Sequence, residues 1–283
     1  MKILITGSNG FLGTKLVSIL SNEFDVVGLN HSQLDITNID KIIQTIKDIK
    51  PDIIINTVAF ADVDKCETDK EKAHDINING IKNIIQICKE LNIKLIHIST
   101  DFVFDGKKGN YSEEDETNPV NYYGQTKLEA EKLIQESGID YIIARVCMLY
   151  GHNGNNSERS FVKWVYENLM NNKPINVFTD HIGTPTLIDD VAQAIITLIK
   201  KEKKGIYHVS GTEKINRHNM ALKIAETFKF DKKLINPITS DQLKQTAKRP
   251  KDTSLNISKL NEIGINMSNV NTGLKIMKEQ MQK

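Results

Sequence analysis

The chain has 283 residues, of which 39% are hydrophobic, so it can bury a full core as one large domain or as a domain with a smaller appendage. Its 37 basic and 36 acidic side chains leave a net charge of +1, and no dense block of Lys and Arg occurs, which argues against a nucleic-acid or membrane-surface partner. Cys66, Cys88 and Cys147 lie far apart without C-x-x-C spacing and predict reduced thiols rather than a disulfide or zinc framework.

The first residues, "MKILITG", already have the pattern of a buried strand, and no apolar run of 18 residues follows them. We therefore expect a cytoplasmic protein without a membrane span. No metal site is predicted, because His74 and His152 have neither a ligand partner at i+4 nor a nearby Cys. His97 falls inside an apolar run and is predicted to be a packed strand residue.

Short apolar runs alternate with longer amphipathic segments through the first half of the chain. The expected strands are 2–6, 24–29, 52–56, 94–99 and 140–145, and the expected helices are 11–21, 38–49, 67–90, 121–137 and 158–171. Continuous apolar strands separated by helices indicate a parallel sheet covered on both faces. The predicted fold is therefore α/β, with a doubly wound parallel sheet of the Rossmann type.

The regular alternation ends near Gly151, where the stretch "GHNGNN" begins. A short strand near "INVF", the turn "HIGTPT" and the apolar helix "LIDDVAQAIITLIK" follow. We expect residues 1–150 to form the Rossmann domain and residues 151–283 to form mostly a smaller substrate-binding lobe. The helix within 186–203 is expected to pack back on the Rossmann core.

The first chemical motif is "TGSNGFLG", residues 6–13, which places Gly7, Gly10 and Gly13 at three-residue intervals directly after the first strand. Glycine permits a tight turn and a close backbone approach, and the next helix offers unpaired N–H groups to a diphosphate. Because a strand precedes the motif and a helix follows it, the pattern predicts a dinucleotide site rather than an ordinary connection.

The end of the second strand bears on the choice of dinucleotide. The sequence there is "GLNHS", with Asn30 and His31 where a carboxylate would hold the ribose 2′-hydroxyl of NAD. The missing carboxylate favours NADP(H), with NAD(H) still possible. Asp35, in "LDIT", is placed either to meet the adenine end of the cofactor or to cap the next helix.

The second motif combines "HISTDFVFDG" at the end of the fourth strand with Tyr123 and Lys127 at the start of a helix. Reduction of a ketone needs a proton donor and a hydrogen-bonding group beside the developing alkoxide. Tyr123 can be that donor, Thr100 can bond the carbonyl oxygen, and Lys127, four residues from Tyr123, can lower the pKa of the phenol and hold the nicotinamide ribose. Tyr122 points elsewhere on the same helix.

These motifs together resemble an extended short-chain dehydrogenase/reductase of the dTDP-4-dehydrorhamnose reductase family. The resemblance runs nearly end to end, through "TGSNGFLG", "LDIT", "PDIIINTVAFADVDKCE", "ISTDFVFDG", "NPVNYYGQTKLEAE", "DHIGTPTLIDDVAQAI", "GIYHVSG" and "KRPKDTSLNISKL". It implies NADP(H)-dependent reduction of a 4-keto-6-deoxy nucleotide-sugar, dTDP-4-dehydrorhamnose to dTDP-rhamnose in cell-surface polysaccharide biosynthesis. A homodimer is compatible with it.

The resemblance also implies a set of site residues. The residues matching Thr100, Tyr123 and Lys127 form the catalytic set. Those matching the cofactor cleft are Gly7, Gly10, Phe11, Leu12, Gly13, Asp35, Ala59 and Ala61. To the same cleft we assign Asn9, Asn30, His31, Ile36, Phe60 and Ser99, with Tyr123 and Lys127. To the substrate we assign Thr100, Asp101, Met148 and Arg249, the last either binding a diphosphate or tying down the C-terminal segment.

One departure from the family pattern leaves an alternative open. The family commonly has a Trp flanking the sugar where "RVCMLYG" has Met148, and a non-aromatic residue there is also typical of the regulatory β-subunit of methionine adenosyltransferase, a cofactor-binding partner rather than an enzyme. Retention of Thr100 with the Tyr/Lys pair favours the reductase. A nucleotide-sugar dehydratase fits less well, because Asp101 is followed by Phe102 instead of Glu.

Overall fold

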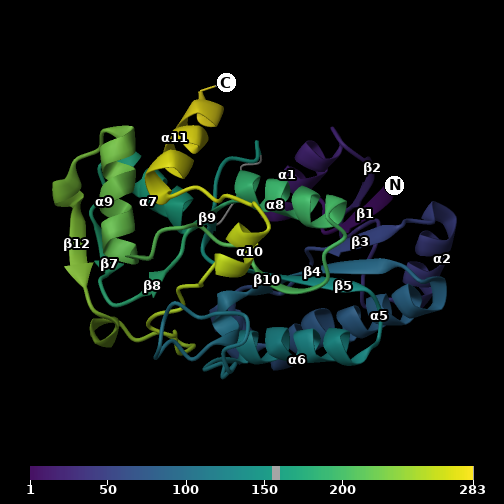
Figure 1. Ribbon diagram of the computed structural model, residues 1–283. Coiled ribbons are helices and arrows are strands. Elements are labelled where there is room, and N and C mark those ends of the chain that lie inside the picture. Colours follow the sequence, from purple (N-terminus) through teal and green to yellow (C-terminus); the bar gives the residue numbers. More distant parts are fainter. Residues whose placement is uncertain (155–159, 283) are drawn as a thin grey trace.

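A parallel sheet forms the centre of the molecule. In the computed structural model, which describes residues 1–154 and 160–282, six parallel strands follow the order β10-β5-β4-β3-β1-β2 (Figure 1). Their bounds are β1 Lys2–Thr6, β2 Asp25–Leu29, β3 Ile53–Asn56, β4 Lys94–Thr100, β5 Tyr141–Val146 and β10 Gly205–His208. The predicted doubly wound α/β fold is confirmed. The sixth strand, β10, was not among the expected strands.

Helices cover both faces of this sheet. One face carries α1 and α8, and the other carries α2, α5 and α6 (Figure 1). Their bounds are α1 Phe11–Leu20, α2 Ile39–Ile49, α5 Gly80–Leu91, α6 Tyr122–Glu136 and α8 Ile188–Lys200. The order of strands reverses direction between β1 and β3, which is where a doubly wound sheet opens a crevice at the carboxyl ends of its strands.

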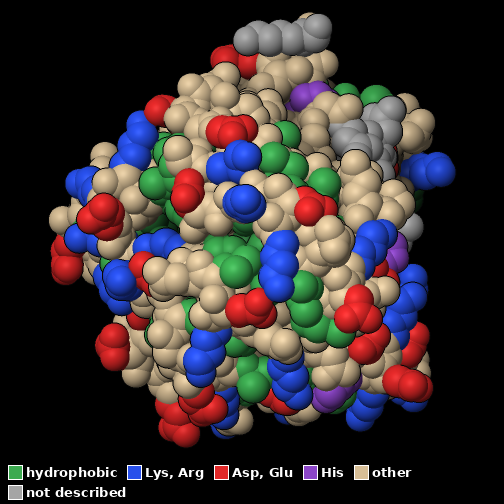
Figure 2. Space-filling model, turned by 90° about the vertical axis from the view of Figure 1, so that its right-hand side faces the viewer, with side chains coloured by type: hydrophobic (Ala, Val, Ile, Leu, Met, Phe, Trp, Pro, Cys, Tyr) green, Lys and Arg blue, Asp and Glu red, His purple; other side chains and the backbone are tan. Residues whose placement is uncertain are grey.

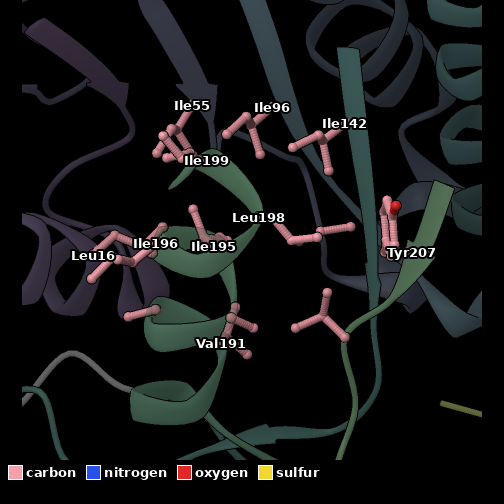
Figure 3. Close-up of a cluster of buried hydrophobic side chains, with 14 of the residues drawn as sticks. Leu16, Ile55, Ile96, Ile142, Val191, Ile195, Ile196, Leu198, Ile199 and Tyr207 are labelled. Carbon is pink, nitrogen blue, oxygen red and sulfur yellow. The ribbon is translucent and has the colours of Figure 1, made fainter. Parts of the chain in front are cut away.

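Helix α8 belongs to the sheet's core although it comes late in the sequence. Its apolar side chains, Val191, Ile195 and Leu198 among them, point toward the sheet and α1 (Figure 3). They are packed with Ile96 and Tyr207 in one buried cluster, so β4, β10 and α8 share the same apolar core. Burying such side chains typically contributes about 1.5–3 kcal/mol each. We propose that the boundary between the two lobes lies near residue 150, with α8 on the sheet side of it.

The prediction of a single helix over 67–90 is wrong. The chain forms three short pieces ahead of α5: α3 Val63–Thr68, α4 Lys70–His74 and a π-helical turn, Asp75–Asn79. Asp69 breaks the helix with φ −129° and caps α4, its side chain accepting from the backbone N–H of Lys72. The π-turn directs the side chain of Asn77 inward to the loop after β3, a tertiary contact that local periodicity does not encode.

The smaller lobe packs its own helices around a second apolar core. It contains α7 Phe161–Met170, α9 Arg217–Phe228 and α11 Val270–Met281, with β7 Ile175–Phe178 paired in parallel to β12 Ile235–Ile238. Shorter pieces are β6 Leu149–Tyr150, β8 Ile182–Gly183, β9 Thr186–Leu187, β11 Ile215–Asn216 and α10 Ser258–Glu262, with 3-10 turns at Asp101–Val103, Lys232–Leu234 and Ser240–Gln242. Helix α7 agrees with the expected helix over 158–171, whose residues 158 and 159 lie outside the described part.

The surface shows no large field of one charge sign on the face drawn in Figure 2, where basic and acidic side chains are interspersed. Within residues 1–154 and 160–282, none of the helices has the length and apolar character needed to span a bilayer. In the same described residues, no group of three or more His, Cys, Asp or Glu side chains is arranged to hold a metal ion.

Candidate active site

The loop between β1 and α1 shows why its glycines differ from one another. Gly7 has a φ of +72°, and a Cβ there would lie 2.8 Å from Thr57 Oγ1. A Cβ on Gly13 would lie 2.2 Å from the carbonyl oxygen of Gly7, so α1 packs directly on the turn. At Gly10, by contrast, the Gly7 oxygen at 3.1 Å is the only described atom within 4 Å of the Cβ position apart from the chain neighbours of Gly10. A side chain on Gly10 would therefore fill space in front of the loop.

The start of α1 can hold an anion. Gly10 precedes the helix, and no side chain of the described residues caps it. An uncapped helix start directs backbone N–H groups and the positive end of the helix dipole outward. Asn9 and Gly10 are exposed, whereas Leu12 and Gly13 are buried, so the last two can contribute only backbone. The empty space at Gly10 and the open helix start together fit a diphosphate.

The end of β2 is built as a polar turn. Asn30 Oδ1 accepts from Ser32 Oγ at 2.7 Å and from the backbone N–H of Gln33 at 3.2 Å, and His31 beside it is exposed. The turn therefore offers amide and imidazole groups, and no carboxylate, at the carboxyl end of β2. This arrangement leaves room for a 2′-phosphate without charge repulsion.

Asp35 does not cap the next helix, and that part of the expectation is wrong. The cap of α2 is Asn38, whose side chain accepts from the backbone N–H of Lys41. Asp35 instead accepts from the backbone N–H and the hydroxyl of Thr37, at 3.0 and 2.8 Å. Burial raises the pKa of Asp35, but these hydrogen bonds outweigh it and leave the pKa below its ordinary value. Ile36 packs in the core, so only its backbone can face a cofactor.

The loop after β3 is clamped by a residue that the sequence reasoning missed. Asn77 Oδ1 accepts from the backbone N–H of Phe60 at 2.8 Å, and its Nδ2 donates to the Phe60 carbonyl and to Thr126 Oγ1 on α6, at 3.2 and 3.0 Å. Ala59 is half-buried and Ala61 is exposed on either side of Phe60. Asn77 therefore ties the expected cofactor loop to the helix that carries Tyr123 and Lys127.

Helix α6 brings Tyr123 to the end of β4. Its cap, Asn121, accepts from the backbone N–H of Gly124 at 2.9 Å and donates to the carbonyl of Lys248 at 2.8 Å. A Cβ on Gly124 would lie 2.2 Å from the Phe102 carbonyl oxygen, so only glycine lets the helix start this close to the turn after β4. The Tyr123 hydroxyl lies near Thr100, which acts on its pKa. The structure thus brings together two residues of the expected catalytic set.

The third residue, Lys127, has different partners from those expected. Its Nζ lies 2.8 Å from His97 Nε2 and donates to the Ile98 carbonyl at 2.8 Å. Burial raises the pKa of Tyr123 above its ordinary value, and Thr100 opposes the rise. The expected lowering of this pKa by Lys127 stays a prediction. The His97 ring is buried, as predicted, and makes a specific polar contact there.

The side chain of Ser99 is hydrogen-bonded to a buried ion pair, which leaves only its backbone for the predicted contact with the cofactor. Its hydroxyl donates to Glu131 Oε1, and Glu131 binds the guanidinium of Arg145 with N–O distances of 2.7 to 3.2 Å. Glu131 is fully buried and Arg145 nearly so. Such a pair is strongly destabilising to break on one side, by about 3–5 kcal/mol. The ion pair lies on the face of the sheet that α6 covers, and it fixes α6 against β4 and β5.

A pocket of about 290 Å³ opens beside the carboxyl end of β4 and reaches into the smaller lobe. Asp101 and Met148 line it from the sheet side, and Phe161, Trp164 and Leu243 give it an apolar outer wall. Met148 has a φ of +45°, a left-handed backbone unusual for a residue other than glycine. The side chains predicted at positions 101 and 148 are therefore both on the wall of one pocket.

Asp101 is buried in that wall. Its carboxylate accepts hydrogen bonds from Thr100 Oγ1 at 3.1 Å, from Cys147 Sγ at 3.2 Å and from Thr253 Oγ1. Burial raises the pKa of Asp101, and these hydrogen bonds only partly oppose the rise. Since Thr100 donates to Asp101, its hydroxyl must rotate before it can donate to a substrate oxygen.

Two guanidinium groups line the same pocket, and one of them was missed from the sequence. Arg249 is held by Asp64 at 2.8 and 3.1 Å, so it both lines the pocket and ties the C-terminal segment to α3. Arg217, at the start of α9, lies with its guanidinium carbon 4.6 Å from the centre of the Phe161 ring. In the described residues its guanidinium forms no ion pair, although the carboxylate of Asp101 acts on it electrostatically, and its N–H donors can meet an anion in the pocket.

Comparison with known proteins gives a consistent result. The family model "RmlD substrate binding domain" matches residues 1–283. A dTDP-4-dehydrorhamnose reductase of Aggregatibacter actinomycetemcomitans is 34% identical, and the match covers 97% of this chain and 97% of that protein. The methionine adenosyltransferase 2 subunit beta of Bos taurus is 31% identical, and the match covers 93% of this chain and 83% of that protein. The structure of dTDP-4-dehydrorhamnose reductase from Bacillus anthracis in complex with NADP is 32% identical, with a TM-score of 0.93 and 99% of each chain covered.

Proposed function

The chain belongs to the RmlD substrate binding domain family, and we propose that it is an NADP(H)-dependent reductase of a 4-keto-6-deoxy nucleotide-sugar. The substrate we propose is dTDP-4-dehydrorhamnose and the product dTDP-rhamnose, an activated sugar for polysaccharide synthesis. NAD(H) remains an alternative cofactor, because related structures of lower identity contain NAD. The proposed place of action is the cytoplasm.

One observation carries this proposal: Thr100 and Tyr123 meet at the carboxyl end of β4, in the same part of the molecule as two separate binding features. One is the open helix start with the side-chain-free space at Gly10, which fits a dinucleotide diphosphate. The other is the pocket that begins at Asp101 and contains two guanidinium groups and an apolar wall. A hydroxyl pair near a dinucleotide crevice and an anion-binding pocket is the arrangement that a ketone reductase needs.

The roles of the residues follow from their contacts. NADP(H), when bound, supplies the hydride for the keto carbon. Tyr123 gives its proton to the oxygen that becomes the alkoxide, and Thr100 donates a hydrogen bond to the same oxygen after turning from Asp101. The Lys127 nitrogen contacts His97 and the Ile98 carbonyl, and these contacts use at most two of its N–H groups. At least one N–H therefore remains for a ribose hydroxyl. The apolar wall excludes water and packs against the base or sugar.

The polar turn after β2 predicts the cofactor preference. We expect calorimetric titration of the purified protein to show NADPH binding at least as tightly as NADH, because Asn30 and His31 present no carboxylate to the 2′-phosphate. A clear preference for NADH would contradict this, and would assign the ribose to Asp35. The informative variant is Asn30→Asp, which should shift the preference toward NADH.

Arg217 provides a prediction about substrate affinity. Arg217→Ala should raise KM for the nucleotide-sugar by roughly 10- to 100-fold with kcat changed little, because a charged hydrogen bond to a phosphate is typically worth about 1.5–3 kcal/mol. Arg217→Lys should recover only part of the affinity, since lysine keeps the positive charge but lacks the paired N–H donors of a guanidinium. The control is Lys214→Ala, which removes a nearby charge paired with Asp252 at 2.6 Å. An unchanged KM in Arg217→Ala would exclude Arg217 from the diphosphate site.

The direct test of the function is turnover. Purified protein is incubated with NADPH and dTDP-4-dehydrorhamnose, and the loss of absorbance of the reduced nicotinamide is followed. We expect loss that depends on both the sugar nucleotide and the protein. The rival function is that of a cofactor-binding subunit for a methionine adenosyltransferase, which the Bos taurus relative and Met148 favour. Co-purification with such an enzyme, and no turnover of any 4-keto nucleotide-sugar, would establish the rival instead.

A further inference from the structure

A row of polar side chains crosses the sheet beneath the proposed cofactor site. Thr6 on β1 is the register partner of Asn56 on β3, and Asn56 is the partner of His97 on β4. The preceding row on the same face, Leu4, Ile54 and Leu95, is entirely apolar and belongs to the core. We call Thr6, Asn56 and His97 the polar row. Each of its members is at most 2% exposed, so each needs a hydrogen-bond partner within the protein.

The polar row is hydrogen-bonded from end to end and finishes at Lys127. Thr6 Oγ1 donates to Asn56 Oδ1 at 2.7 Å, and the Asn56 side-chain nitrogen lies 3.2 Å from His97 Nδ1. His97 Nε2 in turn lies 2.8 Å from Lys127 Nζ. Lys127 is 2% exposed, and its Nζ also donates to the Ile98 carbonyl. The lysine is thus held against β4 by two contacts.

Donor and acceptor counting fixes the protons in this arrangement. Asn56 Oδ1 accepts from Thr6 Oγ1 and from the backbone N–H of Val58 at 3.3 Å, so the Asn56 nitrogen faces His97 as a donor. His97 Nδ1 must then be an acceptor, and a neutral ring carries its hydrogen on Nε2, pointing at Lys127. An ammonium group has no lone pair to accept that hydrogen. The arrangement therefore describes Lys127 as an uncharged amine.

A charged Lys127 requires a second arrangement of the same atoms. His97 Nε2 must become the acceptor, the ring hydrogen must move to Nδ1, and Asn56 must turn its oxygen toward the ring. Two other charged groups lie near Lys127. Glu131 lies one turn further along α6, and Arg145 on β5 forms an ion pair with Glu131 at 2.7 Å. Burial lowers the pKa of Lys127 to about 8, and Glu131 opposes this. The pKa of Lys127 therefore brings both charge states, and with them both arrangements, within reach of a pH titration.

We propose that the polar row is the positioning device of Lys127: His97 holds its nitrogen against β4, and the tautomer of His97 changes together with the charge of the lysine. His97 is a positioning residue, since it contacts Lys127 and acts through it. The proposal rests on the proposed function only in its consequence for catalysis, because the coupling between His97 and Lys127 is a property of the chain itself.

The decisive test needs no enzymatic activity. Nitrogen NMR of the histidine side chains distinguishes the two tautomers, and the His97 signals are assigned by their loss in His97→Gln. We expect the Nε2–H form above a pH of about 8 and the Nδ1–H form below it, with no such transition in Lys127→Met. A single tautomer of His97 through this range, or a transition that persists in Lys127→Met, would overturn the proposal.

Kinetics then test the consequence by a double-mutant cycle. His97→Leu is expected to lower kcat by roughly 10- to 100-fold, since it removes a buried hydrogen bond to a chargeable group, and to change kcat less than about twofold in the Lys127→Met background. His97→Gln should recover part of kcat, because its amide can either donate or accept. The matched control is His208→Leu, a buried histidine bound to Arg145 and not to Lys127, whose effect should be equal in both backgrounds. Equal effects of His97→Leu in both backgrounds would contradict the proposal.

Absence of turnover in the wild-type chain would refute the proposed function and leave the NMR result to decide this inference.

Discussion

Tyr123→Phe is expected to lower kcat by about 10²- to 10⁴-fold, the usual cost of removing a positioned general acid. The Tyr123 hydroxyl lies near Thr100, and the neighbouring carboxyl of Asp101 is already engaged by Thr100, Cys147 and Thr253. Burial raises the pKa of Tyr123, so the phenol stays protonated at neutral pH and remains ready to donate. NADPH affinity, measured by calorimetry, should stay nearly unchanged because the substitution removes only one oxygen atom.

Tyr122→Phe is the matched control, since it makes the same chemical change one position earlier. The backbone N–H of Tyr122 donates to Glu67 at 2.7 Å, and its ring lies beneath Lys70 Nζ at 5.1 Å. Tyr122 lines a surface groove with α4 and not the pocket that begins at Asp101. Its loss should change kcat by only a few fold. A larger loss from Tyr122→Phe than from Tyr123→Phe would reverse the assignment of the acid.

Gly10→Val should reduce NADPH affinity by roughly 100-fold or more and leave the fold largely intact, because the new side chain would occupy the space that the diphosphate needs. Apart from its chain neighbours, the described atoms near a Cβ at Gly10 amount to one carbonyl oxygen at 3.1 Å, so the turn needs to shift by only a few tenths of an ångström. Calorimetry measures the affinity, and circular dichroism with thermal unfolding measures the fold.

Gly13→Ala provides the contrast within the same motif. Its Cβ would lie 2.2 Å from the Gly7 carbonyl oxygen, so α1 or the turn must move, and the melting temperature should fall. The two variants thus separate a glycine needed by the ligand from one needed by the fold. Tight NADPH binding by folded Gly10→Val would place the cofactor elsewhere.

The fold was predictable because each strand and helix of the sheet region has its own local pattern. Five of the six parallel strands are apolar runs bounded by breakers, and helices such as α2 and α6 begin at Asn38 and Asn121, which cap them. The four-residue strand β10 was not identified from the sequence, since so short a run is distinguishable as a strand only by its pairing with β5. The break at Asp69 likewise depends on Asn77 reaching Phe60.

The candidate site was predictable where order along the chain carries the chemistry. Gly7, Gly10 and Gly13 follow a strand, and Thr100 and Tyr123 stand in the expected sequence, so both features could be located before their contacts were known. The partners of Lys127 could not, because the contact with His97 depends on the register of three strands. Arg217 could not either, since a lone arginine after a short strand has no local pattern that indicates a pocket.

The position of β10 has a consequence for the newly made chain. Residues 205–208 supply the outer strand beside β5, and α8 just before them covers one face of the sheet. A ribosome that has finished the first 150 residues has therefore made five strands whose last edge is still open and one of whose faces is covered by α1 without α8. Open edges and exposed apolar faces are the features that promote association between unfinished chains. We therefore expect residues 1–150 expressed alone to aggregate, and the chain to become resistant to protease only once β10 has left the ribosome.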